Sequence, residues 1–167
     1  MTEKVAVITG SGDGLGKGIA QRLAQDGFRI VLSDINAATL EKTEAEFKAA
    51  GQAVTAFRGD VSRREDQFAL VQHAVQAFGR IDVFVNNAGI EDVMPLDKVT
   101  AADFDRVFGI NVKGVLFGIQ AAAEQMKKQG GDRICKIINA ASIAAHESYD
   151  LLGVYCASKH AVRSLTV

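Results

Sequence analysis

Short apolar runs alternate along the chain with segments in which apolar residues recur every three or four positions. A short, continuous apolar run is typical of a strand buried on both faces of a parallel sheet, whereas the longer recurrence is typical of an amphipathic helix. This pattern predicts five strands, at residues 5–9, 28–33, 53–58, 81–85 and 134–139. It predicts helices at residues 14–26, 37–50, 63–78, 101–128 and from 154 onward.

Capping signals support several of these helix boundaries. Asn36 and Ser62 each precede a helical pattern, and their side chains are suited to accept hydrogen bonds from the free N–H groups of a first helical turn. The long fourth helix begins at Thr100 or Ala101, and two glycines at 130 and 131 end it.

Strands that alternate with helices of this length imply βαβ units with right-handed crossovers. We therefore expect an α/β fold, a doubly wound parallel sheet of the Rossmann type, forming a single domain over residues 1–167. Such folds combine two halves of three strands, whereas this pattern supplies three strands and then two. We expect the C-terminal part of the domain to be missing, after the fifth strand and part of the following helix. The fifth strand would then be a long apolar edge.

Composition and charge narrow the choice of partners. The chain has 167 residues and a net charge of −1, without a basic stripe, so nucleic acid is not an expected partner. Its apolar runs are too short to span a bilayer, and its start lacks the apolar core of a signal peptide. Cys135 and Cys156 form no paired motif, and the three histidines lack metal-ligand spacing. We expect a cytoplasmic protein with reduced thiols and no metal.

A glycine-rich turn joins the first strand to the first helix. Glycines allow the backbone to turn tightly and to approach a pyrophosphate, while the N-terminus of the helix offers free N–H groups and a partial positive charge. An ordinary strand-to-helix turn would use glycine too, but the position in the first βαβ unit favours dinucleotide binding. The expected cofactor-binding residues of the turn are Gly10, Gly12, Asp13, Gly14, Leu15 and Gly16.

Asp34 ends the second predicted strand, 18 residues after Gly16. A carboxylate at this point can accept hydrogen bonds from both ribose hydroxyls of the adenosine half and repels a 2′-phosphate. Neither residues 35–36 nor residues 11–13 include a lysine or arginine. The alternative is a carboxylate that only caps the strand end. The pattern favours NAD over NADP as the cofactor.

Further motifs follow in a fixed order along the chain. They are the T-G-x-x-x-G-L-G turn from Thr9, the Asp60–Val61 pair, the N-N-A-G segment 86–89, Asn111 within I-N-V, Ser142, and the Y-x-x-x-K motif from Tyr155 to Lys159. With this set the chain resembles the short-chain dehydrogenases/reductases, over its whole length. Members of that family normally run to about 250 residues, near the upper range for one domain.

The resemblance implies roles for these residues. The implied catalytic residues are Asn111, Ser142, Tyr155 and Lys159. Asp60, Val61, Asn87, Ala88 and Gly89 would bind the cofactor, together with Tyr155, Lys159 and the glycine-rich turn. Asn111 would hold a water that links Lys159 to solvent. The resemblance also implies a homodimer or homotetramer, packed through the two long helices.

The chemistry explains why these residue types are needed. A phenol, with an ordinary pKa of about 10, is a poor base near neutrality, and a nearby ammonium group favours its ionised form. Tyr155 and Lys159 are four residues apart, so a helix places them on one face. Ser142 would hydrogen-bond the substrate oxygen. Ile143 and Tyr149 could line an apolar wall for a small substrate, although packing or loop coverage would also explain them.

The amino-acid sequence of several segments, such as residues 111–122 and 136–144, is similar to that of acetoin reductases and 2,3-butanediol dehydrogenases within the family. The resemblance implies an NAD-dependent enzyme that moves a hydride between nicotinamide and a small ketone or alcohol: diacetyl, acetoin or 2,3-butanediol. A 3-oxoacyl thioester or a sugar alcohol would suit the same chemistry. An inactive, truncated dinucleotide-binding module is the alternative outside catalysis.

Overall fold

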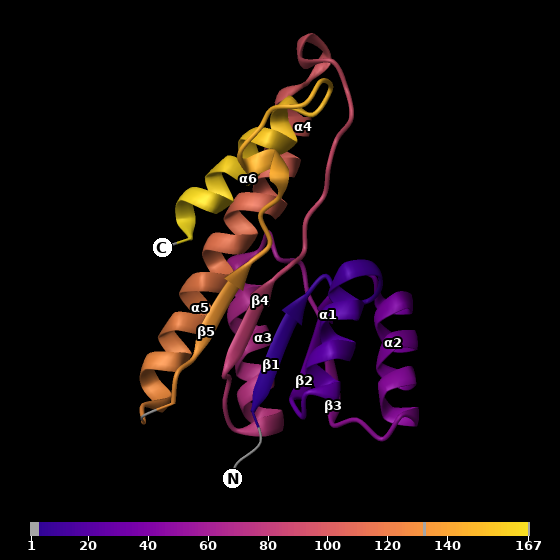
Figure 1. Cartoon of the computed structure of the whole chain (residues 1–167), viewed down its shortest axis with the longest axis vertical. Helices are drawn as coiled ribbons and strands as arrows, with labels where there is room; N and C mark the ends of the chain where they lie inside the picture. Colours follow the sequence, from indigo (N-terminus) through magenta and orange to yellow (C-terminus); the bar gives the residue numbers. More distant parts are fainter. Residues whose placement is uncertain (1–3, 132, 167) are drawn as a thin grey trace.

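The computed structural model describes residues 4–131 and 133–166. These residues form a five-stranded, fully parallel sheet in the order β3-β2-β1-β4-β5, with helices on both faces (Figure 1). The predicted α/β class and the doubly wound parallel sheet are confirmed. The strands are β1 (Val5–Thr9), β2 (Arg29–Asp34), β3 (Val54–Arg58), β4 (Val83–Asn86) and β5 (Lys136–Asn139).

The helices follow the predicted order, with one interruption. The long fourth helix is divided by a π-helical turn, η2, which falls at the segment that carries Asn111. Thr100 caps this helix, because its hydroxyl accepts a hydrogen bond from the N–H of Asp103 at 3.2 Å. The elements are α1 (Gly14–Gln25), α2 (Ala37–Ala49), α3 (Arg64–Phe78), α4 (Ala101–Phe108), η2 (Gly109–Lys113), α5 (Gly114–Gln129) and α6 (Gly153–Leu165).

The predicted cap at Ser62 is wrong, and the reason is a competing partner. The hydroxyl of Ser62 donates a hydrogen bond to Oδ1 of Asp60 at 2.7 Å, and its backbone N–H donates to the same oxygen. The turn that these bonds form delays the start of α3 to Arg64, with Arg63 at the N-cap position. A serine that bonds locally in a turn competes with its own use as a helix cap.

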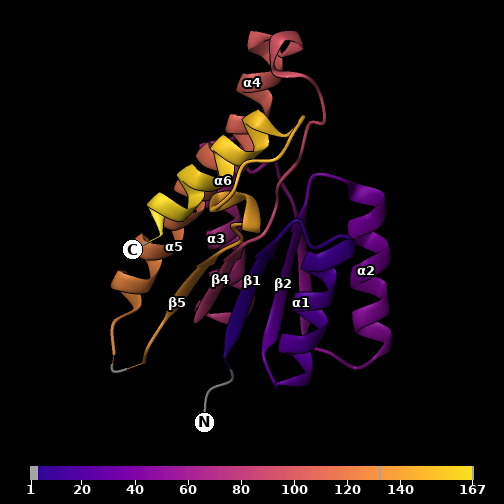
Figure 2. The same cartoon turned by 45° about the horizontal axis from the view of Figure 1, so that its top comes forward.

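The core lies in two layers, one on each face of the sheet. All five residues of β1 are buried, and successive side chains point to opposite faces. Val5 and Val7 pack with α3 and α5, whereas Ala6 and Ile8 pack with α1 and α2. Figure 2 shows α1 and α2 together on one side of the sheet and α5 on the other. Each buried valine or isoleucine contributes about 1.5–3 kcal/mol through removal from water.

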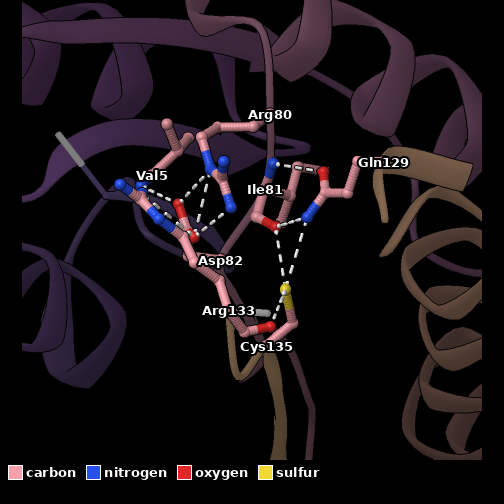
Figure 3. A network of polar contacts seen from close by, with 7 residues as sticks. All are labelled: Val5, Arg80, Ile81, Asp82, Gln129, Arg133 and Cys135. Atoms are coloured by element: carbon pink, nitrogen blue, oxygen red, sulfur yellow. Dashed lines mark hydrogen bonds and ion pairs between the residues drawn. The ribbon is translucent and has the colours of Figure 1, made fainter. Parts of the chain in front are cut away.

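A polar cluster joins the amino ends of β1 and β4 (Figure 3). The buried carboxylate of Asp82 accepts a hydrogen bond from the N–H of Val5 at 2.9 Å. Its two oxygens also accept hydrogen bonds from the guanidinium of Arg80, at 2.8 to 3.1 Å. The guanidinium of Arg133, which precedes β5, lies 4.0 Å from the same carboxylate. Asp82 therefore holds together the ends of the central strands.

The strand order places a crevice at the opposite end of the sheet. The chain runs outward from β1 to β2 and β3, and then crosses back to form β4 on the other side of β1. At such a switch point the loops after the two neighbouring strands diverge, and ligands of doubly wound proteins bind there. The carboxyl ends of β1 and β4 are therefore where a binding site is expected.

Candidate active site

A cavity of about 550 Å³ opens at the carboxyl ends of the strands, at the switch point between β1 and β4. It brings together most of the residues singled out in the sequence, from five separate segments. Its lining consists of Gly10, Asp13, Gly14, Leu15, Gly16, Asp34, Ile35, Gly59, Asp60, Val61, Asn87, Ala88, Gly89, Ile90, Glu91, Ile110, Ala140, Ala141, Tyr155 and Lys159.

The glycine-rich turn is packed so closely that one position excludes any side chain. A Cβ atom at Gly16 would lie 2.0 Å from the carbonyl oxygen of Gly10 and 2.6 Å from the amide nitrogen of Asn87. Gly10 itself has a φ of +63°, a left-handed conformation that glycine adopts without strain. The backbone of the turn therefore approaches the cavity directly.

Asn87 ties this turn to the end of β4. Its side-chain amide donates hydrogen bonds to the carbonyl oxygens of Thr9 and Gly10, both at 3.0 Å. In return, the hydroxyl of Thr9 accepts hydrogen bonds from the backbone N–H groups of Asn87 and Ala88. The two sides of the crevice are thus fixed relative to each other by side chains from both motifs.

The N-terminus of α1 faces the cavity without a capping side chain. Asp13 occupies the N-cap position but makes no side-chain hydrogen bond to the helix, and the first turn has no acidic residue. By contrast, the side chain of Asn36 accepts hydrogen bonds from the first turn of α2. The N–H groups and the positive end of the helix dipole at α1 are therefore suited to an anion such as a pyrophosphate.

Asp34 lies at the end of β2, on the adenosine side expected from the sequence. One carboxylate oxygen accepts a hydrogen bond from the N–H of Gly12 at 3.0 Å, and the other accepts one from the N–H of Asn36 at 2.9 Å. These bonds orient the carboxylate, which still faces the cavity. Asp60 and Val61, after β3, line the same end of the cavity.

Tyr155 and Lys159 lie one turn apart on α6, and both line the cavity. The Lys159 ammonium nitrogen is 5.6 Å from the centre of the Tyr155 ring and donates a hydrogen bond to the carbonyl oxygen of Ala140 at 2.8 Å. Only 6% of Lys159 is exposed, and this burial lowers the pKa of its ammonium group. A cation is therefore held, at a cost in solvation, directly beside a phenol.

Asn111 lies behind the cavity, fully buried, within the π-helical turn. Its amide exchanges two hydrogen bonds with the backbone of Ile90, at 2.9 and 2.8 Å, and donates a third to the hydroxyl of Ser158 at 3.0 Å. These bonds join the loop after β4 to α6. The side chain of Asn111 is therefore engaged within the protein and does not itself line the cavity.

The three residues expected on the substrate side are outside the cavity lining. Ser142 follows the lining residue Ala141 and is partly buried, and its hydroxyl accepts a hydrogen bond from the N–H of Ala144 at 3.2 Å. Ile143 is 66% exposed. Tyr149, which is also exposed, donates a hydrogen bond to a carboxylate oxygen of Glu147 at 3.1 Å. That these three residues contact a substrate remains a prediction.

Sequence reasoning missed several apolar residues of the lining and one close basic group. Ile35 directly follows Asp34, and Ile90 and Ile110 flank the buried Asn111. Arg58, the neighbour of Asp34 across the sheet, donates a hydrogen bond to the carbonyl oxygen of Ile35. Ile35 could have been predicted as a lining residue, because it directly follows the end of a strand. The position of Arg58 beside Asp34 could not, because it depends on the register between β2 and β3.

Over 4–131 and 133–166, no group of three or more histidine, cysteine, aspartate or glutamate side chains is placed to hold a metal ion. Across the same ranges, none of the helices combines the length and apolar character needed to cross a membrane.

Similarity to characterised proteins extends over nearly the whole chain. The chain is 57% identical over 163 residues to a diacetyl reductase [(S)-acetoin forming] of Staphylococcus epidermidis, and 39% identical to an L-2,3-butanediol dehydrogenase of Corynebacterium glutamicum. Each match covers 98% of this chain and 63% of the relative. The chain thus spans somewhat less than two thirds of the length of these curated relatives.

A solved structure and a family model agree with this similarity. A short chain dehydrogenase/reductase from Burkholderia phymatum, crystallised in complex with NAD, superposes with a TM-score of 0.94 at 41% identity. That match covers 98% of this chain and 58% of the other. The family model described as short chain dehydrogenase matches residues 4–167. The glycine-rich turn, the ordered motifs and the parallel sheet are accounted for together: the chain belongs to the short-chain dehydrogenase family.

Proposed function

We propose that the protein is an NAD-dependent oxidoreductase that reduces small vicinal diketones and ketols, such as diacetyl and acetoin, and oxidises 2,3-butanediol. The observation that carries this proposal is the buried Lys159 beside Tyr155, at one end of a cavity whose other end has Asp34. The names of the two relatives, a diacetyl reductase and a butanediol dehydrogenase, support the substrate class.

The cavity fits a dinucleotide at three points. The close packing of Gly16 against Gly10 holds the turn at the uncapped start of α1, where free N–H groups can bind a pyrophosphate. The carboxylate of Asp34 can accept the hydroxyls of the adenosine ribose and repels a 2′-phosphate. Lys159 can reach the hydroxyls of the second ribose from the opposite end. We infer that Gly10, Gly12, Asp13, Gly14, Leu15, Asp60, Val61, Asn87, Ala88 and Gly89 complete this binding site.

Tyr155 and Lys159 perform the proton transfer in this proposal. Bound NADH would supply the hydride to the carbonyl carbon of the substrate. The phenol of Tyr155 gives its proton to the carbonyl oxygen as negative charge develops there, and in the reverse direction its ionised form, the phenolate, removes the proton of the alcohol. The ammonium of Lys159 stabilises the negative charge that develops on the phenol oxygen when this proton leaves.

Ser142 and Asn111 act around this pair. The hydroxyl oxygen of Ser142 accepts a hydrogen bond from Ala144, so its own O–H remains to donate to the substrate oxygen. That bond orients the substrate and stabilises its charge. Asn111 fixes the position of Ile90 and, through Ser158, the helix that carries the catalytic pair. We propose that Ile143 and Tyr149 contact the methyl-bearing end of the substrate.

The proposal is tested by the consumption of NADH when diacetyl or acetoin is added to the purified full-length protein. We expect turnover with both, and a loss of about 10²–10⁴-fold in kcat/KM for Tyr155→Phe, because one acid-base group contributes about this factor. Calorimetric titration of the variant with NAD controls for folding and should still show binding. Sugar alcohols and 3-oxoacyl thioesters belong in the same assay. A higher kcat/KM for either would replace the proposed substrate class, and absence of turnover with all of them would refute the enzymatic proposal.

A further inference from the structure

A threonine of α2 is hydrogen-bonded to the glycine-rich turn from behind. Thr43 is 1% exposed, and its hydroxyl donates a hydrogen bond of 2.7 Å to the carbonyl oxygen of Gly12. The two residues are 31 positions apart in the chain. Thr43 is not part of the cavity lining, and none of the sequence motifs includes it. Its hydroxyl nevertheless reaches the backbone of the glycine-rich turn.

Both peptide groups of Gly12 are fixed by side chains. On one side, its N–H donates to the carboxylate of Asp34 at 3.0 Å. On the other side, its carbonyl oxygen accepts the hydrogen bond from Thr43. The space around Gly12 is also closed, because a Cβ atom there would lie 3.0 Å from Oδ2 of Asp34. Gly12 therefore joins the carboxylate of Asp34 on one side to α2 on the other.

The bond from Thr43 also sets the direction of a backbone donor. A trans peptide group is planar, so its C=O and N–H point in opposite directions. Because the carbonyl of Gly12 points to the buried hydroxyl on α2, the N–H of Asp13 points away from α2. Asp13 lines the cavity at the start of α1, where the turn meets the proposed pyrophosphate position.

We propose that Thr43 is a positioning residue for the cofactor, which sets both the affinity for NAD and the discrimination against NADP. The inference rests on the proposed function, since it concerns the same dinucleotide site. Without the hydroxyl, the peptide between Gly12 and Asp13 loses the bond that fixes its direction, and the backbone that holds one oxygen of Asp34 through the N–H of Gly12 is less constrained. The site then loses an oriented donor, and the carboxylate that repels a 2′-phosphate keeps a firm bond only to the N–H of Asn36.

Thr43→Val tests this proposal, because valine has nearly the same shape and lacks the hydroxyl. Calorimetric titration with NAD and with NADP gives the two dissociation constants. We expect the Kd for NAD to rise about tenfold, the factor that corresponds to one hydrogen bond, and the ratio of the NADP to the NAD constant to fall. Thr43→Ser keeps a hydroxyl and should restore both values. If valine prevents folding, Thr43→Cys, with a weaker donor of similar size, should give intermediate values.

Thr55→Val is the matched control. The hydroxyl of Thr55 is hydrogen-bonded to the ring nitrogen Nε2 of His73 at 2.9 Å, between β3 and α3 and outside the cavity lining. The substitution should lower the melting temperature without changing the ratio of the dissociation constants for NADP and NAD. Wild-type affinity and ratio in Thr43→Val, or an equal change in Thr55→Val, would overturn the inference alone. Failure of the wild-type protein to bind NAD would instead overturn the proposed function, and this inference with it.

Discussion

Gly16 shows how a single hydrogen atom can decide whether the site forms. Its Cα faces the carbonyl oxygen of Gly10 so closely that a methyl group would overlap it. Gly18, two residues later on the exposed side of the same helix, has open space around it. The same residue type is therefore required at position 16, where no side chain fits, but not at position 18, where one would fit.

We expect Gly16→Ala to destabilise the protein by about 1–3 kcal/mol through overpacking, and to abolish detectable binding of NAD. The added methyl group must displace both the backbone of Gly10 and the side-chain amide of Asn87, which ties the turn to the end of β4. Urea unfolding and calorimetry measure the two effects. Gly18→Ala is the control and should stabilise the protein by about 0.5–1 kcal/mol, since alanine favours a helix interior over glycine. Normal NAD affinity in Gly16→Ala would contradict the packing described.

Lys159 predicts a pH dependence of stability. Because burial lowers its pKa in the folded protein, the folded state binds fewer protons than the unfolded state between the lowered value and the ordinary value of about 10.4. Stability from this group is therefore lowest when the ammonium is charged, and rises with pH through that window. We expect Lys159→Met to remove this rise. Between pH 7 and pH 10, the unfolding free energy of the wild-type protein should therefore increase relative to that of the variant.

Urea unfolding at several pH values measures this difference. Lys159→Arg serves as a second variant, because its guanidinium stays charged throughout the range. It should also lack the rise, while retaining a positive charge at this position. A rise that persists unchanged in Lys159→Met would show that another group is its origin.

The spacing of apolar residues predicted well which helices and strands exist and in which order they follow one another. The five strands and the helices between them follow from apolar spacing alone, because burial against a two-sided sheet imposes that spacing. The boundaries are less well predicted where a tertiary partner intervenes. Residues 81 and 82 were expected in β4, but Ile81 pairs through its backbone with the side chain of Gln129, and the strand begins at Val83.

The π-helical turn in the fourth helix was not predictable from local sequence. Residues 109–113 continue the apolar pattern of the helix, and no proline marks a break. The distortion accompanies three hydrogen bonds of Asn111 to Ile90 and Ser158, which are far away in the sequence. The resemblance singles out Asn111, but only the structure shows that its amide joins the loop after β4 to α6.

For the whole molecule, the candidate site and the main ionic cluster lie at opposite ends of the sheet. The residues of the cavity follow the carboxyl ends of the strands, whereas Asp82 and Arg80 precede β4 (Figure 3). The sequence predicted most of the cavity lining, since motifs at strand ends must meet in a parallel sheet. It gave no indication of the Asp82 cluster, because that cluster depends on which strands are neighbours.

We expect Asp82→Asn to destabilise the protein by about 3 kcal/mol, because it leaves the guanidinium of Arg80 beside a buried group without charge. The amide of Asn has only one oxygen, so its NH2 group faces either the N–H of Val5 or the guanidinium of Arg80, both of which are donors. Asp97→Asn, which breaks the exposed pair with Lys98, is the control and should cost at most about 1 kcal/mol. Urea unfolding compares the two variants. The Kd for NAD of folded Asp82→Asn should equal that of wild type, and a large change would contradict the separation of the two ends.

This separation has a consequence for the ways in which the protein can change. Substitutions in the loops that follow the strands alter what the crevice accepts, and they leave intact the charges that hold the amino ends of the strands. A lineage can therefore acquire new substrates one loop at a time while this ionic cluster is kept. The same property recommends those loops to an engineer as the place to begin diversification.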